Sequence, residues 1–161
     1  MNIKNEVCFL ENKTQLEAQL VAGVEKDLRF VDGIIREKGR EILKDYGITP
    51  PQFVALQWLK EEGDMTIGDL STKMYLAFST TTDLIDRMEK NNLVLRLKNP
   101  QDRRVVKVHL LEEGSRIIHE AIARRQQYLS NLLNTFEVDE VVVLQSLLSK
   151  LHKEMKLEEK A

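Results

Sequence analysis

The sequence predicts a mainly α-helical protein with one small β-hairpin. Apolar residues recur at helical spacing over long proline-free segments at both ends of the chain, and apolar–polar alternation flanks a loop that contains Asn99 and Pro100. The chain has 161 residues, of which 42% are hydrophobic and 31% are charged. These values predict one globular domain with an ordinary hydrophobic core.

We expect the first element to be one long amphipathic helix between Thr14 and Tyr46. No proline interrupts this segment, and its apolar positions recur at steps of three, four or seven: Leu20, Val24, Leu28, Val31, Ile35, Ile42 and Tyr46. Globular helices usually have about 8–20 residues, so a helix of this length indicates association with another helix.

Two shorter helices should follow. Thr49 as the N-cap, Pro50 at the first helical position and Gln52 at the third predict the start of one. Its buried side is expected to hold Phe53, Leu56, Leu59 and Trp58. Thr66 with Asp69 predicts the start of the next helix. This helix is expected to bury Ile67, Leu70 and Met74.

A fourth helix is predicted for the stretch FSTTTDLIDRMEKNN. Its inner positions follow the i, i+3, i+4, i+7 spacing and are Thr81, Leu84, Ile85 and Met88. Its outward positions are Ser79, Thr80, Asp83, Asp86, Arg87 and Lys90. Asn91 and Asn92 should end the helix, because asparagine tolerates a left-handed cap.

The hairpin is predicted from the stretches LVLRLK and VVKVHL. In the first strand we expect one face to hold Leu93, Leu95 and Leu97 and the other to hold Arg96 and Lys98. In the second, Val106, Val108 and Leu110 alternate with Lys107 and His109.

Two helices are expected to close the chain. The first follows Gly114 and carries Ile117, Ile118, Ala121, Ile122, Arg125, Leu129, Leu132 and Leu133. The last begins near Val138 and carries Val141, Leu144, Leu147, Leu148, Leu151 and Met155.

Charge is distributed unevenly. The chain carries a net charge of −2, yet the segment from Arg87 to Lys107 contains seven basic and two acidic residues. That segment therefore carries +5 and the remainder carries −7. This asymmetry indicates a local binding surface for an anionic partner on a body that otherwise repels it.

The residues that could support catalysis are scattered. The three histidines, His109, His119 and His152, have no His or Cys neighbour at metal-ligand spacing, and no phosphate-binding Gly-rich loop or nucleophile elbow occurs. We therefore expect no enzymatic activity and no metal or other cofactor.

The single cysteine, Cys8, excludes an intrachain disulfide and fits a reducing compartment. Glu6 and Glu11 lie nearby and disfavour a thiolate, so we expect an ordinary thiol that precedes the helical body. No signal peptide or membrane-length apolar run is found, and the expected location is the cytoplasm.

A short helix followed by one whose outward start reads STTTD is typical of a helix-turn-helix. A Ser/Thr-rich helix start alone is more often simple capping. The hairpin that follows makes the pattern a winged helix-turn-helix, which predicts binding to double-stranded DNA. The expected major-groove residues are Phe78, Ser79, Thr80, Thr82, Asp83 and Arg87. The expected wing residues are Lys98, Asp102, Arg103 and Arg104, with Asp102 orienting an arginine.

The stretch LIDRMEKNNLVLRLKNPQDRRVVKVHLLEEG resembles the recognition-helix end and wing of the MarR family of bacterial transcription regulators. Asp102-Arg103-Arg104 matches the Asp-x-Arg wing motif of that family, and Leu110 with Gly114 matches its Leu-Thr-x-x-Gly junction. The resemblance extends over roughly residues 28–151 and is strongest over 84–114.

The resemblance implies a symmetric dimer in which the first and last helices intertwine and two recognition helices read a palindromic operator. It also implies a regulator, often a repressor, that a small phenolic or other effector releases from DNA. We therefore expect a single winged-helix domain over residues 1–161, with a DNA-binding core at 49–111 and dimerisation helices at 1–48 and 112–161.

Several positions depart from the family pattern. Leu111, Ala77 and Glu137 stand where a capping Ser or Thr is usual, and Asn92 replaces a usual glycine. Asp83 and Asp86 place two negative charges on the expected DNA face. These acids, with the acidic body, leave an alternative open: a winged-helix module that has lost DNA binding and holds a protein partner.

Overall fold

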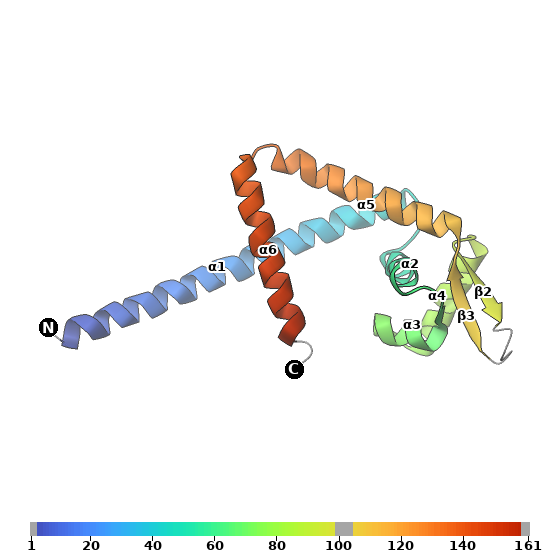
Figure 1. The fold of residues 1–161 in the computed structure, drawn as a ribbon, viewed down its shortest axis with the longest axis horizontal. Coiled ribbons are helices and arrows are strands. Elements are labelled where there is room, and N and C mark those ends of the chain that lie inside the picture. The colour runs from blue at the N-terminus through green and yellow to red at the C-terminus, as the bar shows by residue number, and fades with distance from the viewer. Residues whose placement is uncertain (1–2, 99–104, 159–161) are drawn as a thin grey trace.

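The computed structural model describes residues 3–98 and 105–158, with side chains described from residue 17 onward. The elements in chain order are α1 (Ile3–Lys44), α2 (Pro50–Glu62), β1 (Met65–Thr66), α3 (Ile67–Met74), α4 (Phe78–Lys90), β2 (Val94–Lys98), β3 (Val106–Leu110), α5 (Glu112–Leu133) and α6 (Val138–Glu158). Figure 1 shows α2, α3, α4 and the hairpin gathered at one end, while α1 and α5–α6 extend away from them. This arrangement confirms the predicted mainly α fold with a hairpin wing.

The start of α1 differs from the prediction. The helix begins at Ile3 rather than near Thr14, so Cys8 lies within α1 and does not precede the helical body. The reason is that the segment before Thr14 contains neither glycine nor proline, and nothing in it stops the helix.

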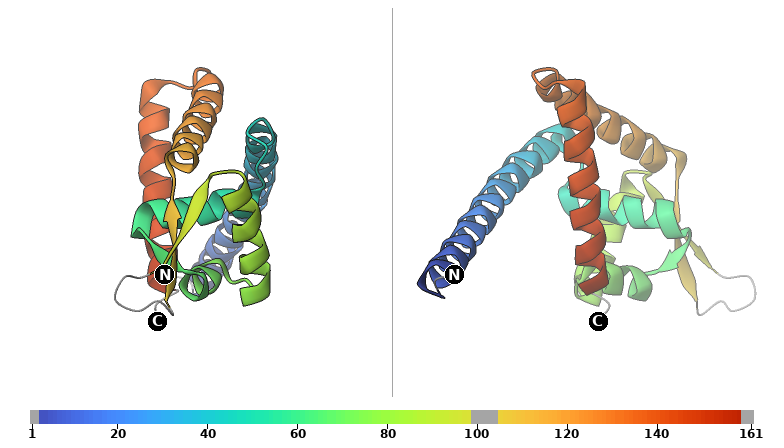
Figure 2. Two further views of the ribbon diagram at one scale, coloured as in Figure 1. Left: turned by 90° about the vertical axis from the view of Figure 1, so that its right-hand side faces the viewer. Right: turned by 60° about the vertical axis from the view of Figure 1, so that its left-hand side comes forward.

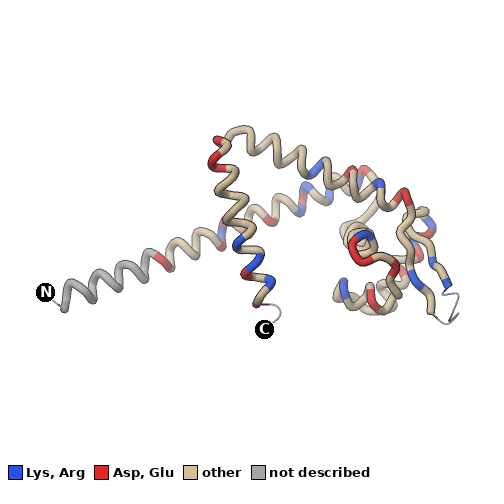
Figure 3. Tube along the Cα trace, viewed as in Figure 1, with Lys and Arg blue, Asp and Glu red and all other residues tan. Residues whose placement is uncertain are grey.

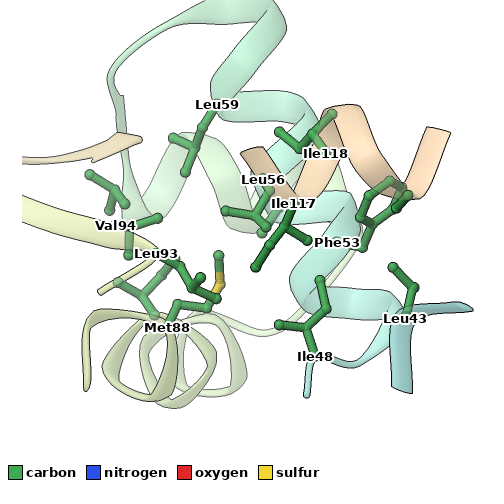
Figure 4. Close-up of a cluster of buried hydrophobic side chains, with 14 of the residues drawn as sticks. Leu43, Ile48, Phe53, Leu56, Leu59, Met88, Leu93, Val94, Ile117 and Ile118 are labelled. Carbon is green, nitrogen blue, oxygen red and sulfur yellow. The ribbon is translucent and has the colours of Figure 1, made fainter. Parts of the chain in front are cut away.

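The hydrophobic core lies where α2 meets α4, β2 and the ends of the long helices. Phe53, Leu56 and Leu59 from α2 are buried, as predicted, and pack with Met88 of α4 and Val94 of β2 (Figure 4). The long helices enter this core through Ile42 and Leu43 of α1 and Ile117, Ile118 and Ala121 of α5. The predicted inner face of α4 is confirmed, because Thr81, Ile85 and Met88 are buried and Leu84 is half-buried.

The sheet has three antiparallel strands in the order β1-β3-β2. β1 was not predicted, because two residues are too few for an alternation pattern. The predicted faces of β3 are confirmed: Val108 is buried and Lys107 and His109 are exposed.

The two faces of β2 hold the predicted residues, but the face with Arg96, and not the face with the leucines, is turned inward. Arg96 pairs with Val108 and Leu95 pairs with His109, so Arg96 shares the inner face and Leu95 the outer one. Leu95 and Leu97 are accordingly 42% and 40% exposed. The physical reason is that α4 supplies carboxylates that neutralise an inward-facing arginine, which an alternation pattern cannot reveal.

The helix ends follow the predicted caps. The Asp69 N–H donates to the Thr66 hydroxyl at 3.1 Å, and Gln52 Oε1 accepts the Thr49 N–H at 2.8 Å. Asn92 has a left-handed φ of 56°, which ends α4 as expected. Neither Ala77 nor Leu111 forms a side-chain cap, in line with their departure from the family pattern.

Gly114 permits a close approach between α5 and the hairpin. A Cβ at this position would lie 2.6 Å from the backbone oxygen of Leu93, a carbonyl that already accepts the Leu111 N–H at 3.0 Å. Any larger residue would push the start of α5 off the base of the hairpin.

Two arginines of α5 hold the long helices on the core. The Arg125 guanidinium lies 5.0 Å from the centroid of the Phe53 ring, and a Cβ at Gly39 would come within 2.8 Å of the same guanidinium. Arg124 forms an ion pair with Asp45 at 2.6 Å. The middle of α5 thereby contacts both the C-terminal end of α1 and Phe53 of α2.

α6 contributes nothing to the core of this protomer. None of its residues is buried, and Val142, Val143, Leu147 and Met155 are each more than half exposed. α1 similarly exposes Leu20, Val21, Val24 and Ile34. Among the described residues, no helix has the length and apolarity needed to cross a membrane.

Candidate nucleic-acid interface

The start of α4 presents a small polar face to solvent. Ser79, Thr80 and Asp83 are exposed, while Thr81 between them is fully buried. The Thr81 hydroxyl donates to the Ala77 carbonyl at 3.1 Å, so the first turn is held from inside although Ala77 cannot cap it. α3 packs against α4, as the second helix of a helix-turn-helix requires.

The predicted major-groove residues differ in accessibility. Phe78 is 61% exposed, and Arg87 is exposed farther along the same helix. Thr82 is half-buried, and its hydroxyl donates to the Phe78 carbonyl at 2.9 Å. Thr80 therefore offers a freer hydroxyl than Thr82.

An ion-pair cluster joins the hairpin to α4. Glu89 accepts the backbone N–H of Arg96 at 2.8 Å and its guanidinium at 2.7 Å. The guanidinium also pairs with Asp86 and lies 3.5 Å from the Thr82 carbonyl oxygen. The hydrogen bond from the Arg96 N–H is the largest influence that lowers the pKa of the Glu89 carboxyl below its usual value.

This cluster corrects the expectation for Asp86. The side chain was expected to face outward and place a negative charge on the DNA face, but it is half-buried and paired with Arg96. Asp83 forms no ion pair with any described residue. One acid therefore remains on the exposed face, not two. In the sequence, the only sign that Arg96 would pair with α4 is the three-residue spacing of Asp86 and Glu89. This spacing places both carboxylates on one side of the helix.

The hairpin carries the remaining cations. Lys98 at the end of β2 and Lys107 on β3 are exposed, and Figure 3 shows basic positions on both strands. The predicted wing residues Asp102, Arg103 and Arg104 lie outside the described residues.

β2 runs back along α4, so its wing-side end lies level with the start of that helix. The α4–β2 connection spans only Asn91 to Leu93, and Arg96 reaches back to the Thr82 carbonyl. Figure 2 shows α3 and the wing-side ends of β2 and β3 at the same end of the molecule. The helix-turn-helix and the wing-side end of the hairpin therefore lie at the same end of the molecule.

Comparison with known proteins decides the family. The profile of the MarR family matches residues 48–106. The uncharacterised HTH-type transcriptional regulator YsmB of Bacillus subtilis (strain 168) is 62% identical over 136 residues, which cover 84% of this chain and 93% of that protein. The chain belongs to the MarR family. This result confirms the resemblance to the MarR family seen in the sequence.

A solved structure and a further relative are also similar to this chain. A MarR family protein from Bacillus stearothermophilus superposes with a TM-score of 0.78 at 56% identity, covering 86% of this chain and 96% of that chain. The HTH-type transcriptional repressor MdtR of Bacillus subtilis (strain 168) is 28% identical over 88% of this chain and 92% of that protein. This chain therefore shares its fold with the MarR family protein from Bacillus stearothermophilus over 86% of its length.

Proposed function

We propose that this MarR-family protein is a non-enzymatic repressor that binds a palindromic operator in double-stranded DNA as a homodimer in the cytoplasm. The carrying observation is the exposed polar start of α4 at the same end of the molecule as the wing-side end of the basic hairpin. Short hydroxyl side chains let a helix approach base edges closely, and cations at its side bind phosphates. The relative MdtR is a transcriptional repressor by name, which supports repression rather than activation.

The major-groove contacts are assigned to Phe78, Ser79, Thr80, Thr82, Asp83 and Arg87. The wing contacts are assigned to Lys98, Arg103 and Arg104, with Asp102 orienting an arginine. In this proposal residues 49–111 form the DNA-binding core. Guanidinium groups favour phosphates and narrow minor grooves, so the wing is assigned to the groove beside the one that α4 enters.

Dimerisation is assigned to residues 1–48 and 112–161. The apolar residues that α1 and α6 expose support this assignment, because a protomer alone leaves them in water. An open groove between α5 and α6 is lined by Leu133, Val141, Leu144 and Leu148 together with Gln145, Ser149 and His152. A two-fold axis would relate two copies of α4, which accounts for a palindromic operator.

The alternative, a module that has lost DNA binding and holds a protein partner, depended on the acidic body and on two acids on the expected DNA face. Pairing of Asp86 with Arg96 removes one of them. The remaining acid, Asp83, is compatible with DNA because a carboxylate accepts a hydrogen bond from the cytosine amino group. DNA binding is therefore the better-supported function.

The deciding experiment measures fluorescence anisotropy on a labelled duplex from the region upstream of the protein's own gene. A scrambled duplex of equal composition is the control. We expect a preference of at least about 10³-fold for the upstream duplex at physiological salt. Equal and weak binding to both duplexes would favour the protein-partner alternative.

Release by a small molecule is part of the proposal on the grounds of family membership. Small phenolic compounds would be titrated into the preformed protein–DNA complex. An effector lowers anisotropy in a saturable way and, by linkage, binds the free dimer more tightly than the DNA-bound dimer.

A further inference from the structure

Tyr75, at the turn between α3 and α4, has a left-handed backbone with φ 54° and ψ 41°. Its N–H donates to the Thr72 carbonyl at 3.2 Å, and the Leu76 N–H donates to the Ser71 carbonyl at 3.0 Å. This closure of a helix requires a left-handed residue and normally uses glycine or asparagine. A bulky side chain adopts the conformation only at a cost in free energy.

The ring of Tyr75 obtains no compensating contact from the residues that the structure describes. The residue is 96% exposed, and within the described ranges its hydroxyl forms no hydrogen bond and its ring stacks on no other group. Glycine would close the same turn at lower cost and would leave no aromatic ring in water. A reason for tyrosine must therefore lie outside the protomer.

The position of Tyr75 indicates what that reason is. It precedes the first residue of α4 by three positions, and that residue, Phe78, is itself 61% exposed. The α3–α4 turn also lies at the end of the molecule that carries the wing-side end of β2 (Figure 2). The exposed N-terminal half of α1, which is assigned to dimerisation, extends away from this turn (Figure 1).

We propose that Tyr75 is a DNA-backbone contact, an inference that rests on the proposed function. With the start of α4 in the major groove, the preceding turn lies over the edge of the groove, where phosphate and sugar are exposed. The phenol hydroxyl donates a hydrogen bond to a phosphate oxygen, and the ring packs against the neighbouring deoxyribose. Tyrosine thereby fixes the depth and angle at which α4 enters the groove.

A neutral phenol gives this contact a distinct signature. Lysine and arginine displace condensed counterions from DNA, and their loss reduces the dependence of affinity on salt. A phenol displaces no cation. Loss of Tyr75 should therefore weaken binding at every salt concentration without changing the slope of log affinity against log salt.

The test compares Tyr75→Gly and Tyr75→Phe with Asn92→Gly. Asn92 is the other described non-glycine residue with a positive φ, 56°, and it lies at the opposite end of α4. Both glycine variants relieve left-handed strain, so both should raise the Tm of the free dimer. Only Tyr75→Gly should weaken operator binding, by about tenfold or more, since a dimer loses the hydrogen bond twice. Tyr75→Phe keeps the ring and should give an intermediate loss.

These measurements distinguish a failure of the Tyr75 contact from a failure of the proposed DNA-binding function. If the wild-type protein shows no operator preference, the proposed function fails. If the wild-type protein binds and Tyr75→Gly binds equally well with a raised Tm, only the inference is overturned. A weaker Tyr75→Gly complex with a reduced salt slope, or an equal loss in Asn92→Gly, would also overturn it.

Discussion

Glu89 on α4 holds both the backbone N–H and the guanidinium of Arg96 on β2, at 2.8 and 2.7 Å. One carboxylate therefore fixes the strand and its side chain to the helix that is assigned to the major groove. The contact lies two residues before Lys98, where the described part of β2 ends. The orientation of the wing relative to α4 depends on this pair.

Replacement of Glu89 by glutamine should uncouple the hairpin from α4. Glu89→Gln keeps an acceptor oxygen but removes the charge, so the loss of unfolding free energy should stay below about 1 kcal/mol for this partly exposed pair. Operator affinity should fall more than stability does, because the wing loses its fixed angle. Glu41→Gln, which breaks an exposed pair with Lys38 on α1, serves as the matched control. Equal operator affinity in both variants would refute a positioning role.

The same pair predicts a pH dependence. The pKa of Glu89 is lowered from its usual value of about 4.5, chiefly by the hydrogen bond from the Arg96 N–H. A carboxyl whose pKa is depressed by folding stabilises the fold above its unfolded pKa, and this stabilisation is lost as pH falls through the folded pKa. The Tm difference between wild type and Glu89→Gln should thus be largest near neutral pH and should shrink on acidification below about pH 4.5. A difference that grows on acidification would contradict this account.

Dimerisation should depend on the apolar face of α6. Truncation after Glu137, or before Val31, should yield aggregated or unfolded protein, because obligate dimers often have no stable monomer. Leu147, which is 60% exposed in the protomer, allows a milder test. Leu147→Asp should lead to aggregation or to loss of folded protein, measured by light scattering and circular dichroism, because the dimer on which folding depends is destabilised. Leu97→Asp, on the outer face of the hairpin, should remain a dimer. A soluble, stable monomer from either truncation would exclude an obligate dimer.

The order of the helices could be predicted because caps and helical periodicity act locally. Thr66 with Asp69, and the inner face around Ile85, follow from residues three or four positions apart. The face of β2 could not be predicted, because it depends on carboxylates of α4 that accept Arg96. Tyr75 was missed for a related reason: its left-handed conformation comes from the closure of α3, not from the preference of tyrosine.

Thr80 and Thr82 should differ in their effect on sequence preference. Thr80 is exposed, whereas the Thr82 hydroxyl already donates to the Phe78 carbonyl. Thr80→Ala should reduce discrimination between the operator and single-base variants by roughly 1–3 kcal/mol per lost base contact. Thr82→Ala should cost less. Competition anisotropy against a set of substituted duplexes measures both, and the reverse order would show that Thr82 changes its partner on binding.

The wing arginines should act on phosphate and not on sequence. Arg104→Ala should fold and dimerise normally while its DNA affinity falls to a similar extent on all duplexes. The log–log salt slope should shrink by about one per lost phosphate contact, and so by about two in a dimer. Asp102→Ala should act in the same direction more weakly, because it frees an arginine without removing it.

Tyr75→Gly serves as a comparison for Arg104→Ala. It should lower DNA affinity without changing the slope of log affinity against log salt. If the Arg103→Ala/Arg104→Ala double variant binds the operator with wild-type affinity and an unchanged slope, the arginines do not contact DNA. The basic charge of the hairpin would then have to act through Lys98 and Lys107, which are exposed on its two strands.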